Sequence, residues 1–148
     1  MSDYLKKFVV CGVGASLLFA GVMWKIQDNL MYLPQVPVQD QDDNPPRYRS
    51  PEERPLLRHY KNVTIEGADR PTLKGWFIRA PNNLSTRTIV FMHENAGNIG
   101  LRMDYFEKLI ESLDVNILTI AYRGFSQSEG TPTEQGIKQD GLDIMKWV

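Results

Sequence analysis

The first residues of this chain that could do chemistry lie between Thr88 and Gly100. An apolar run there stops at His93 and opens into a polar turn that comprises Glu94, Asn95, Ala96, Gly97 and Asn98. Open α/β sheets place their ligands at the carboxyl ends of strands, where backbone N–H groups can converge on an anion. Any function that the sequence shows is therefore expected to begin at this turn.

A catalytic base could come from two histidines, His59 and His93. Four aspartates lie on or beside predicted helices with no histidine at a readable spacing, which disfavours them as triad acids: Asp104, Asp114, Asp140 and Asp143. We expect His59 to be solvated and structural. The sequence shows no metal-ligand spacing and no phosphate-binding glycine motif, so it predicts neither a metal nor a cofactor.

A second polar loop, residues 123–130, also follows a predicted strand. Around Ser126 and Ser128 the loop matches the Gly-x-Ser-x-Gly pattern of a nucleophile elbow at all but one fixed position. A true elbow leads directly from strand into helix, whereas several loop residues precede the next helical pattern here. Hydrogen bonding within the loop is thus favoured over a nucleophilic role for either serine.

Elements around both loops indicate an α/β domain. The apolar run 89–92 predicts a strand buried on both faces, and 115–122 predicts a second. Between them, one apolar helical face is marked by Ile99, Met103, Phe106, Ile110 and Leu113. Strand, helix and strand in this order predict a parallel βαβ unit.

Further elements flank this unit. Residues 62–66 and 73–79 predict an antiparallel hairpin around the turn at 67–71. A capping box with Thr131 as the cap and Pro132 at the first helical position predicts a last helix. Its apolar positions run to the last residue with no stop signal, so we expect the helix to be cut rather than ended.

The amino-terminal third is expected to lie outside the α/β domain. Residues 8–24 carry no charge and have lysines on both sides, which predicts a transmembrane signal anchor after a cytosolic tail, 1–7. A cleaved secretory signal is the alternative, but Met23-Trp24-Lys25 is a poor cleavage site. Proline-rich residues 25–55 predict a semi-rigid stalk, with the domain at 56–148.

Composition excludes one class of partner. The formal net charge is -1, from 17 basic and 18 acidic residues, so no field would recruit nucleic acid. A lone cysteine, Cys11, allows no internal disulfide and leaves the redox compartment unspecified.

Taken together, the motifs resemble the α/β-hydrolases, and within them the membrane-anchored bud-emergence (Bem-type) branch. HENAGNIG at 93–100 is similar to that branch's oxyanion turn, and YRGFSQSEG at 122–130 is similar to its YRG-x-G-x-S-x-G loop. The proline-rich RSPEER segment and the LKGWF strand extend the resemblance over most of the chain. It implies the amino-terminal part of an α/β-hydrolase sheet behind a transmembrane helix.

This resemblance also implies a function: serine hydrolysis of acyl esters or thioesters, palmitoylated proteins among them, at a membrane that the chain crosses once. Asn95 would donate its backbone N–H to the oxyanion, and His93 would orient the loop by hydrogen bonding. Glu94 stands where the family usually has glycine. If it required a positive φ it would be strained, and if it faced the pocket it would oppose the oxyanion.

No nucleophile elbow follows the last predicted helix. The sequence therefore predicts a catalytically incomplete fragment with no triad residue. The alternative is a non-catalytic, membrane-anchored protein that binds a partner through an open sheet edge at the Thr88 strand.

Overall fold

A computed structural model describes residues 2–37, 40–67, 69–82 and 87–148 of the chain. It divides into two compact units, Met1–Met31 and Tyr32–Val148, which are described separately.

The first unit is helix α1, Asp3–Met31. Its Lys7–Met31 stretch has a mean hydropathy of 1.8 and none of its most apolar window is buried. The helix is long and apolar enough to cross a membrane, which fits membrane association. It continues seven residues past the predicted span because no proline interrupts it before Pro34. The position directly before a proline disfavours the helical conformation, so helices commonly end by that point.

The second unit contains one mixed sheet of β1 (Tyr60–Gly67), β2 (Arg70–Ile78), β3 (Thr88–Phe91) and β4 (Asn116–Ile120). Its order is β1-β2-β4-β3. β1 pairs with β2 and β2 with β4 in antiparallel fashion, whereas β3 and β4 are parallel. The predicted hairpin and βαβ unit are thus confirmed. The hairpin turn includes Ala68, which lies outside the described residues.

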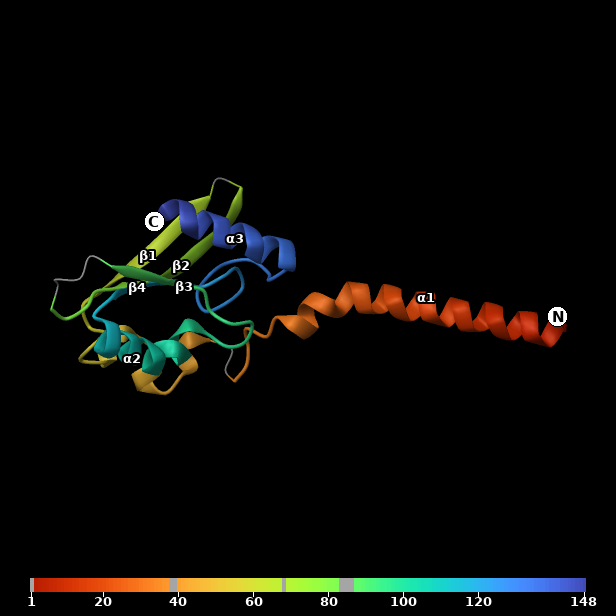
Figure 1. Ribbon diagram of the computed structural model, residues 1–148, viewed down its shortest axis with the longest axis horizontal. Helices are drawn as coiled ribbons and strands as arrows, with labels where there is room; N and C mark the ends of the chain where they lie inside the picture. The colour runs from red at the N-terminus through yellow and green to blue at the C-terminus, as the bar shows by residue number, and fades with distance from the viewer. Residues whose placement is uncertain (1, 38–39, 68, 83–86) are drawn as a thin grey trace. The chain divides into compact units, whose positions relative to one another are not determined.

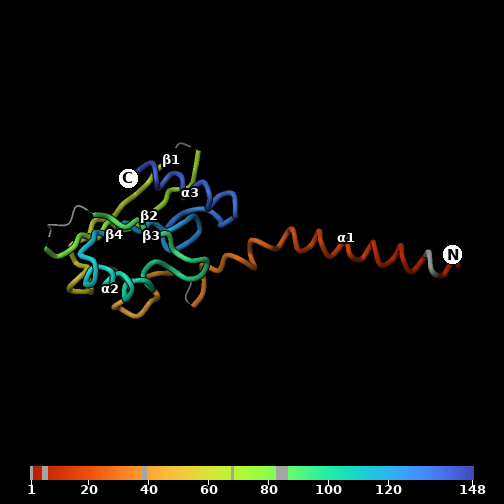
Figure 2. Tube along the Cα trace, viewed as in Figure 1, coloured from red at the N-terminus to blue at the C-terminus, as the bar shows by residue number. Residues whose placement is uncertain are grey.

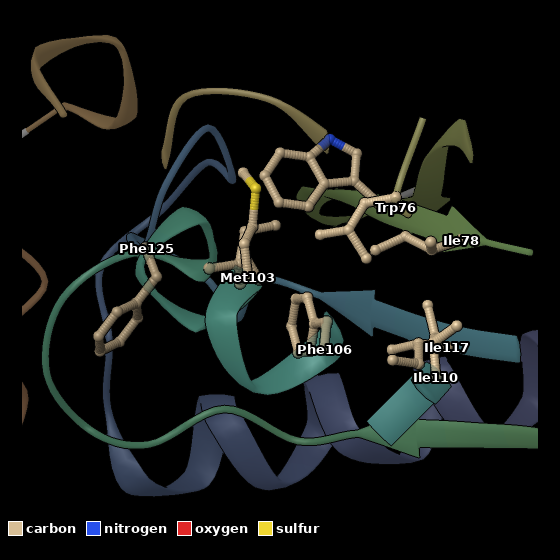
Figure 3. Close-up of a cluster of buried hydrophobic side chains, with 10 residues drawn as sticks. Trp76, Ile78, Met103, Phe106, Ile110, Ile117 and Phe125 are labelled. Carbon is tan, nitrogen blue, oxygen red and sulfur yellow. The ribbon is translucent and has the colours of Figure 1, made fainter. Parts of the chain in front are cut away.

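Two helices cover the sheet, α2 (Met103–Leu113) on one face and α3 (Glu134–Trp147) on the other (Figure 1). A short 3₁₀ helix, η4 (Ile99–Arg102), leads into α2. The larger core lies between α2 and the sheet (Figure 3), and its buried members include Trp76, Ile78, Met103, Phe106, Ile110, Ile117 and Phe125. A smaller core, which includes Leu118 and Ile144, lies under α3.

Three local predictions differ from the structure. β3 is half-buried rather than buried on both faces, because it is an edge strand of the described sheet. Leu113, at the end of the predicted apolar face of α2, is 47% exposed. The cap of α3 is Thr133, whose side chain accepts a hydrogen bond from the Gly136 N–H, so the helix begins two residues later than the predicted Thr131 cap implied.

The predicted stalk is the main correction. After α1, the described part of residues 32–55 belongs to the second unit and forms three 3₁₀ helices, η1 (Gln41–Asp43), η2 (Pro46–Tyr48) and η3 (Pro51–Glu53). Prolines begin two of these turns, a position where their missing N–H costs nothing. The segment packs on α2, so it is part of the domain.

Arg54 shows how this segment is held. Its side chain is 3% exposed and forms ion pairs with Asp104 (2.7 Å) and Glu107 (2.6 Å), both on α2. Its guanidinium also lies over the Tyr48 ring. A buried cation with two carboxylate partners fixes the segment far more firmly than exposed polyproline chain would.

Helix α3 contains two glycines in different surroundings. A Cβ added to Gly136 would lie 2.7 Å from the guanidinium of Arg123, so close packing requires glycine there. Nothing lies within 4 Å of the same position on Gly141.

Candidate functional site

The polar turn after β3 begins with a buried histidine. His93 is 5% exposed and lies against the rings of Tyr122 and Phe125, with centroids 4.3 and 4.9 Å away. Its Nε2 accepts a hydrogen bond from the Tyr122 backbone N–H (3.0 Å). Its Nδ1 is 2.8 Å from the backbone oxygen of Glu94. The ring therefore ties the end of β3 to the loop that follows β4.

These contacts define the protonation state of His93. Since Nε2 accepts, Nδ1 carries the proton and donates it to the Glu94 carbonyl. Burial lowers the pKa of His93 from 6.5 to about 4, an effect only partly offset by the hydrogen bond to the Glu94 backbone. The imidazole is neutral at physiological pH, and both of its nitrogens are engaged, which leaves none for a general-base role.

The same hydrogen bond orients the backbone N–H of Asn95. The peptide unit between Glu94 and Asn95 is planar and trans, so its C=O and N–H point in opposite directions. With the Glu94 oxygen directed at the His93 ring, the Asn95 N–H is directed away from that ring. Asn95 itself is exposed. The peptide between Glu94 and Asn95 is thereby held in one orientation beyond the carboxyl end of β3.

The next peptide unit is held from another side. The Asn95 backbone oxygen accepts from the Leu33 N–H (2.8 Å), and the Leu33 oxygen accepts from the Gly97 N–H (3.0 Å). Together they form an isolated parallel bridge between Leu33 and Ala96. In Figure 2 the orange trace that leaves α1 meets the green turn after β3 at this point.

Glu94 has an ordinary backbone conformation and a charged partner. Among the described residues, the non-glycine positions with positive φ are Asp114 and Ser126, so Glu94 is not strained. Its carboxylate forms a 2.7 Å ion pair with Arg102. Arg102 also donates to the Ala96 carbonyl (2.6 Å), so one guanidinium offsets the charge and closes the turn.

Asn98 anchors the far end of the turn. Its side chain is 1% exposed and exchanges two hydrogen bonds with the side chain of Asn44, of 2.7 and 3.1 Å. Asn44 is fully buried and also donates to the Tyr48 carbonyl (2.9 Å). A Cβ on Gly100 would lie 2.0 Å from that same carbonyl oxygen, so the two segments approach as closely as backbones can.

Both serines of the second loop act as hydrogen-bonding groups. Ser126 Oγ accepts from the Ile99 backbone N–H (3.0 Å) and so supports the start of η4. Ser128 Oγ accepts from the Lys74 N–H (2.9 Å) and donates to the Ala121 carbonyl (2.7 Å). Neither hydroxyl contacts a histidine in the described structure, which supports their reading as structural groups.

The four aspartates that the sequence disfavours as triad acids have other partners. Asp140, 1% exposed, binds the backbone N–H and guanidinium of Arg123 at 2.7–3.1 Å. Asp104 pairs with Arg54, which together with Tyr48 holds the pKa of that carboxyl below its ordinary value. Asp143 pairs with Arg70, and Asp114 caps α2 in the left-handed conformation.

No group of three or more potential metal ligands occurs among the described residues. A cavity of about 230 Å³ is lined in part by Lys74, Trp76, Ile99, Ser126 and Gln127. None of residues 93–98 is among the described residues that line it.

Four residues that support the turn were not identified from the sequence: Leu33, Asn44, Arg102 and Tyr122. Leu33 and Tyr122 act through backbone N–H groups, which carry no residue-type signal. Asn44 lies in a segment whose prolines and acidic residues predicted solvent exposure. The position of Arg102, eight residues after Glu94, could have suggested the ion pair once η4 was recognised.

Comparisons with known proteins agree with this fold. No family model matches the chain. It is similar to protein bem46 of Schizosaccharomyces pombe, with 28% identity over 99% of the chain and 47% of the relative. It is also similar to the alpha/beta hydrolase domain-containing protein WAV2 of Arabidopsis thaliana, with 32% identity over 89% of the chain and 39% of the relative. The chain thus spans less than half the length of each.

A solved structure supports the same fold. An alpha-beta hydrolase from Vibrio vulnificus superposes with a TM-score of 0.50 and 19% identity, over 60% of this chain and 29% of that one.

Proposed function

The chain belongs to the α/β-hydrolase superfamily, in its Bem-type branch, and we propose that its turn at residues 93–98 is the acyl-oxygen-binding half of a serine hydrolase site. The reaction is hydrolysis of an acyl ester or thioester, with palmitoylated proteins as the expected substrate class. Substrate oxygen becomes negatively charged in the tetrahedral intermediate, and a preorganised N–H stabilises that charge without reorganisation.

One observation carries the proposal: the peptide that presents the Asn95 N–H is held by the neutral ring of His93, which is itself held by Tyr122. Such a peptide cannot easily flip its N–H away from the substrate. The Glu94 carboxylate beside it is paired with Arg102, which limits its repulsion of a nearby oxyanion.

We propose no nucleophile, base or acid for this reaction among the described residues. Within the described chain, Ser126, Ser128 and His93 are committed to structural hydrogen bonds. Residues 1–148 alone are therefore expected to be catalytically incomplete. A membrane location would suit a lipid-linked acyl substrate, and α1 has the length and composition of an anchor.

Fusion of residues 1–148 to the remaining part of the hydrolase domain of WAV2 tests this function. Asn95→Pro removes the proposed donor, whereas Asn95→Ala keeps it and serves as the matched control. We expect the proline variant to lower kcat for acyl thioester hydrolysis by about 10²- to 10³-fold, the usual effect of losing one oxyanion donor. Equal rates in the two variants, with both folded, would refute the oxyanion role of Asn95.

Fluorophosphonate labelling of the unfused chain tests its incompleteness. We expect no covalent labelling. Labelling that disappears in Ser126→Ala or Ser128→Ala would place the nucleophile in the second loop and overturn the proposal.

A second candidate function is partner binding through β3. β3 is an edge strand of the described sheet, and edge strands offer unpaired backbone groups to another strand. Its Ile89, Val90 and Phe91 are half-buried, so apolar surface accompanies that edge. Analytical ultracentrifugation of residues 32–148 tests this reading, since monomeric behaviour at high concentration would count against an edge that pairs with other chains.

A further inference from the structure

We infer that residues 33–36, here called the strap, are a positioning segment for the candidate oxyanion turn. This inference rests on the proposed function of that turn. Its role is to hold the peptide unit on the carboxyl side of Asn95, as His93 holds the one on the amino side. The strap begins at the second residue after α1 ends, so the chain that leaves the apolar helix also completes the site.

Two backbone hydrogen bonds make the connection. The Leu33 N–H donates to the Asn95 carbonyl, and the Leu33 carbonyl accepts from the Gly97 N–H, at 2.8 and 3.0 Å. These atoms are 62 and 64 positions apart in the sequence, so chain continuity alone does not bring them together. The pattern is that of a one-residue parallel strand addition.

The strap and His93 act on the same residue from opposite sides. His93 fixes the carbonyl of Glu94, and Leu33 fixes the carbonyl of Asn95. Since each peptide unit is planar, both ends of the φ and ψ rotations of Asn95 are constrained. Release of the strap would remove the hydrogen bond to the Asn95 carbonyl and leave that of His93 to the Glu94 carbonyl in place.

Close approach of the backbones supports a specific contact. Gly97 has φ of +73°, and a Cβ there would lie 2.8 Å from the Val36 carbonyl oxygen. Tyr32, directly before the strap, packs against the larger core. By contrast, the Leu33 and Val36 side chains are 39% and 51% exposed. The strap therefore acts through its backbone, anchored by Tyr32.

A backbone mechanism allows a clean pair of variants. Leu33→Pro removes the N–H that binds Asn95, whereas Leu33→Ala keeps it and alters only a largely exposed side chain. Both are made in the full 148-residue chain in lipid nanodiscs. Residual dipolar coupling of the Asn95 N–H reports its direction, and amide exchange of Gly97 reports the second bond. Couplings of β4 amides report the rest of the fold.

We expect Leu33→Pro to change the Asn95 coupling and to speed Gly97 exchange about tenfold, the effect of weakening a net hydrogen bond. Leu33→Ala should match the wild type in both, and β4 couplings should be unchanged throughout. Equal Asn95 couplings in the two variants would overturn the inference.

If Leu33→Pro fails to fold, amide exchange of Gly97 in the wild-type chain tests the inference. Gly97 exchange slowed to the level of β4 amides supports the strap, and exchange at the rate of unstructured chain overturns it. No measurement here depends on hydrolysis. Failure of the proposed function would appear instead as unchanged turnover in Asn95→Pro, so the two failures are distinguishable.

Discussion

Acidification should destabilise the domain through His93. The folded-state pKa of about 4 lies below the ordinary value of 6.5, because the ring is buried and its Nε2 already accepts a bond from Tyr122. Between these two values the unfolded chain binds a proton that the folded chain does not. Stability contributed by the neutral ring is therefore complete above pH 6.5 and is lost as the pH falls toward about 4.

The size of this effect follows from the same two values. A difference between 6.5 and about 4, at about 1.36 kcal/mol per pH unit, corresponds to about 3 kcal/mol in the free energy of unfolding. At about pH 4.5 the expected loss is about 2.5 kcal/mol, since the folded form has begun to protonate only slightly. Protonation would also place an N–H of the ring opposite the Tyr122 N–H, and so release the turn from the loop that follows β4.

Urea unfolding of the full chain in nonionic micelles, followed by tryptophan fluorescence, which includes that of the buried Trp76, measures this loss. His93→Gln should show a shallower pH dependence than the wild type between about pH 6.5 and about pH 4.5. Comparison with the variant removes the contribution of carboxylates, which both proteins share. Identical slopes in the wild type and His93→Gln would refute the reasoning.

Further substitutions probe the supports of the turn. Asn98→Ala should lower the free energy of unfolding by about 2–3 kcal/mol, because one N–H and the oxygen of the buried Asn44 amide lose their partner. A double-mutant cycle of Asn44 and Asn98 in urea unfolding should show strong coupling. Asp140→Ala should lower the free energy of unfolding by about 3–5 kcal/mol, because it leaves the Arg123 guanidinium unpaired. Thermal unfolding would detect this loss, and Asp140→Asn should show a smaller one. Gly100→Ala should prevent η2 from docking, since its methyl group would overlap a carbonyl oxygen of η2, and limited proteolysis should then cut the segment before β1.

The strands and helices of the domain were predictable because their side-chain patterns are local. Apolar runs gave β3 and β4, and three- and four-residue spacing gave α2, whose Met103, Phe106 and Ile110 are indeed buried. Mixed pairing in the sheet followed from a hairpin and a βαβ unit. Cap identity at Thr133 was missed because two threonines flank Pro132 and both satisfy a simple capping rule.

Contacts that hold the candidate site were not predictable in the same way. Proline and acidic composition indicated an extended stalk, yet Arg54 is buried between two carboxylates of α2, a pairing that composition cannot reveal. Similarly, Asn44 and Asn98 meet across 54 positions of sequence. The ion pair between Glu94 and Arg102 likewise depends on the geometry of the turn, which residue types alone do not give.

The two glycines of α3 offer a practical consequence for work with this protein. Glycine inside a helix is less favourable than alanine by about 0.5–1 kcal/mol, because it loses more backbone freedom on folding. Gly136 must accept that penalty to make room for Arg123, whereas the open surroundings of Gly141 impose no such need. Gly141→Ala should therefore give a more stable protein for spectroscopy and crystallisation, and it leaves the site residues unchanged.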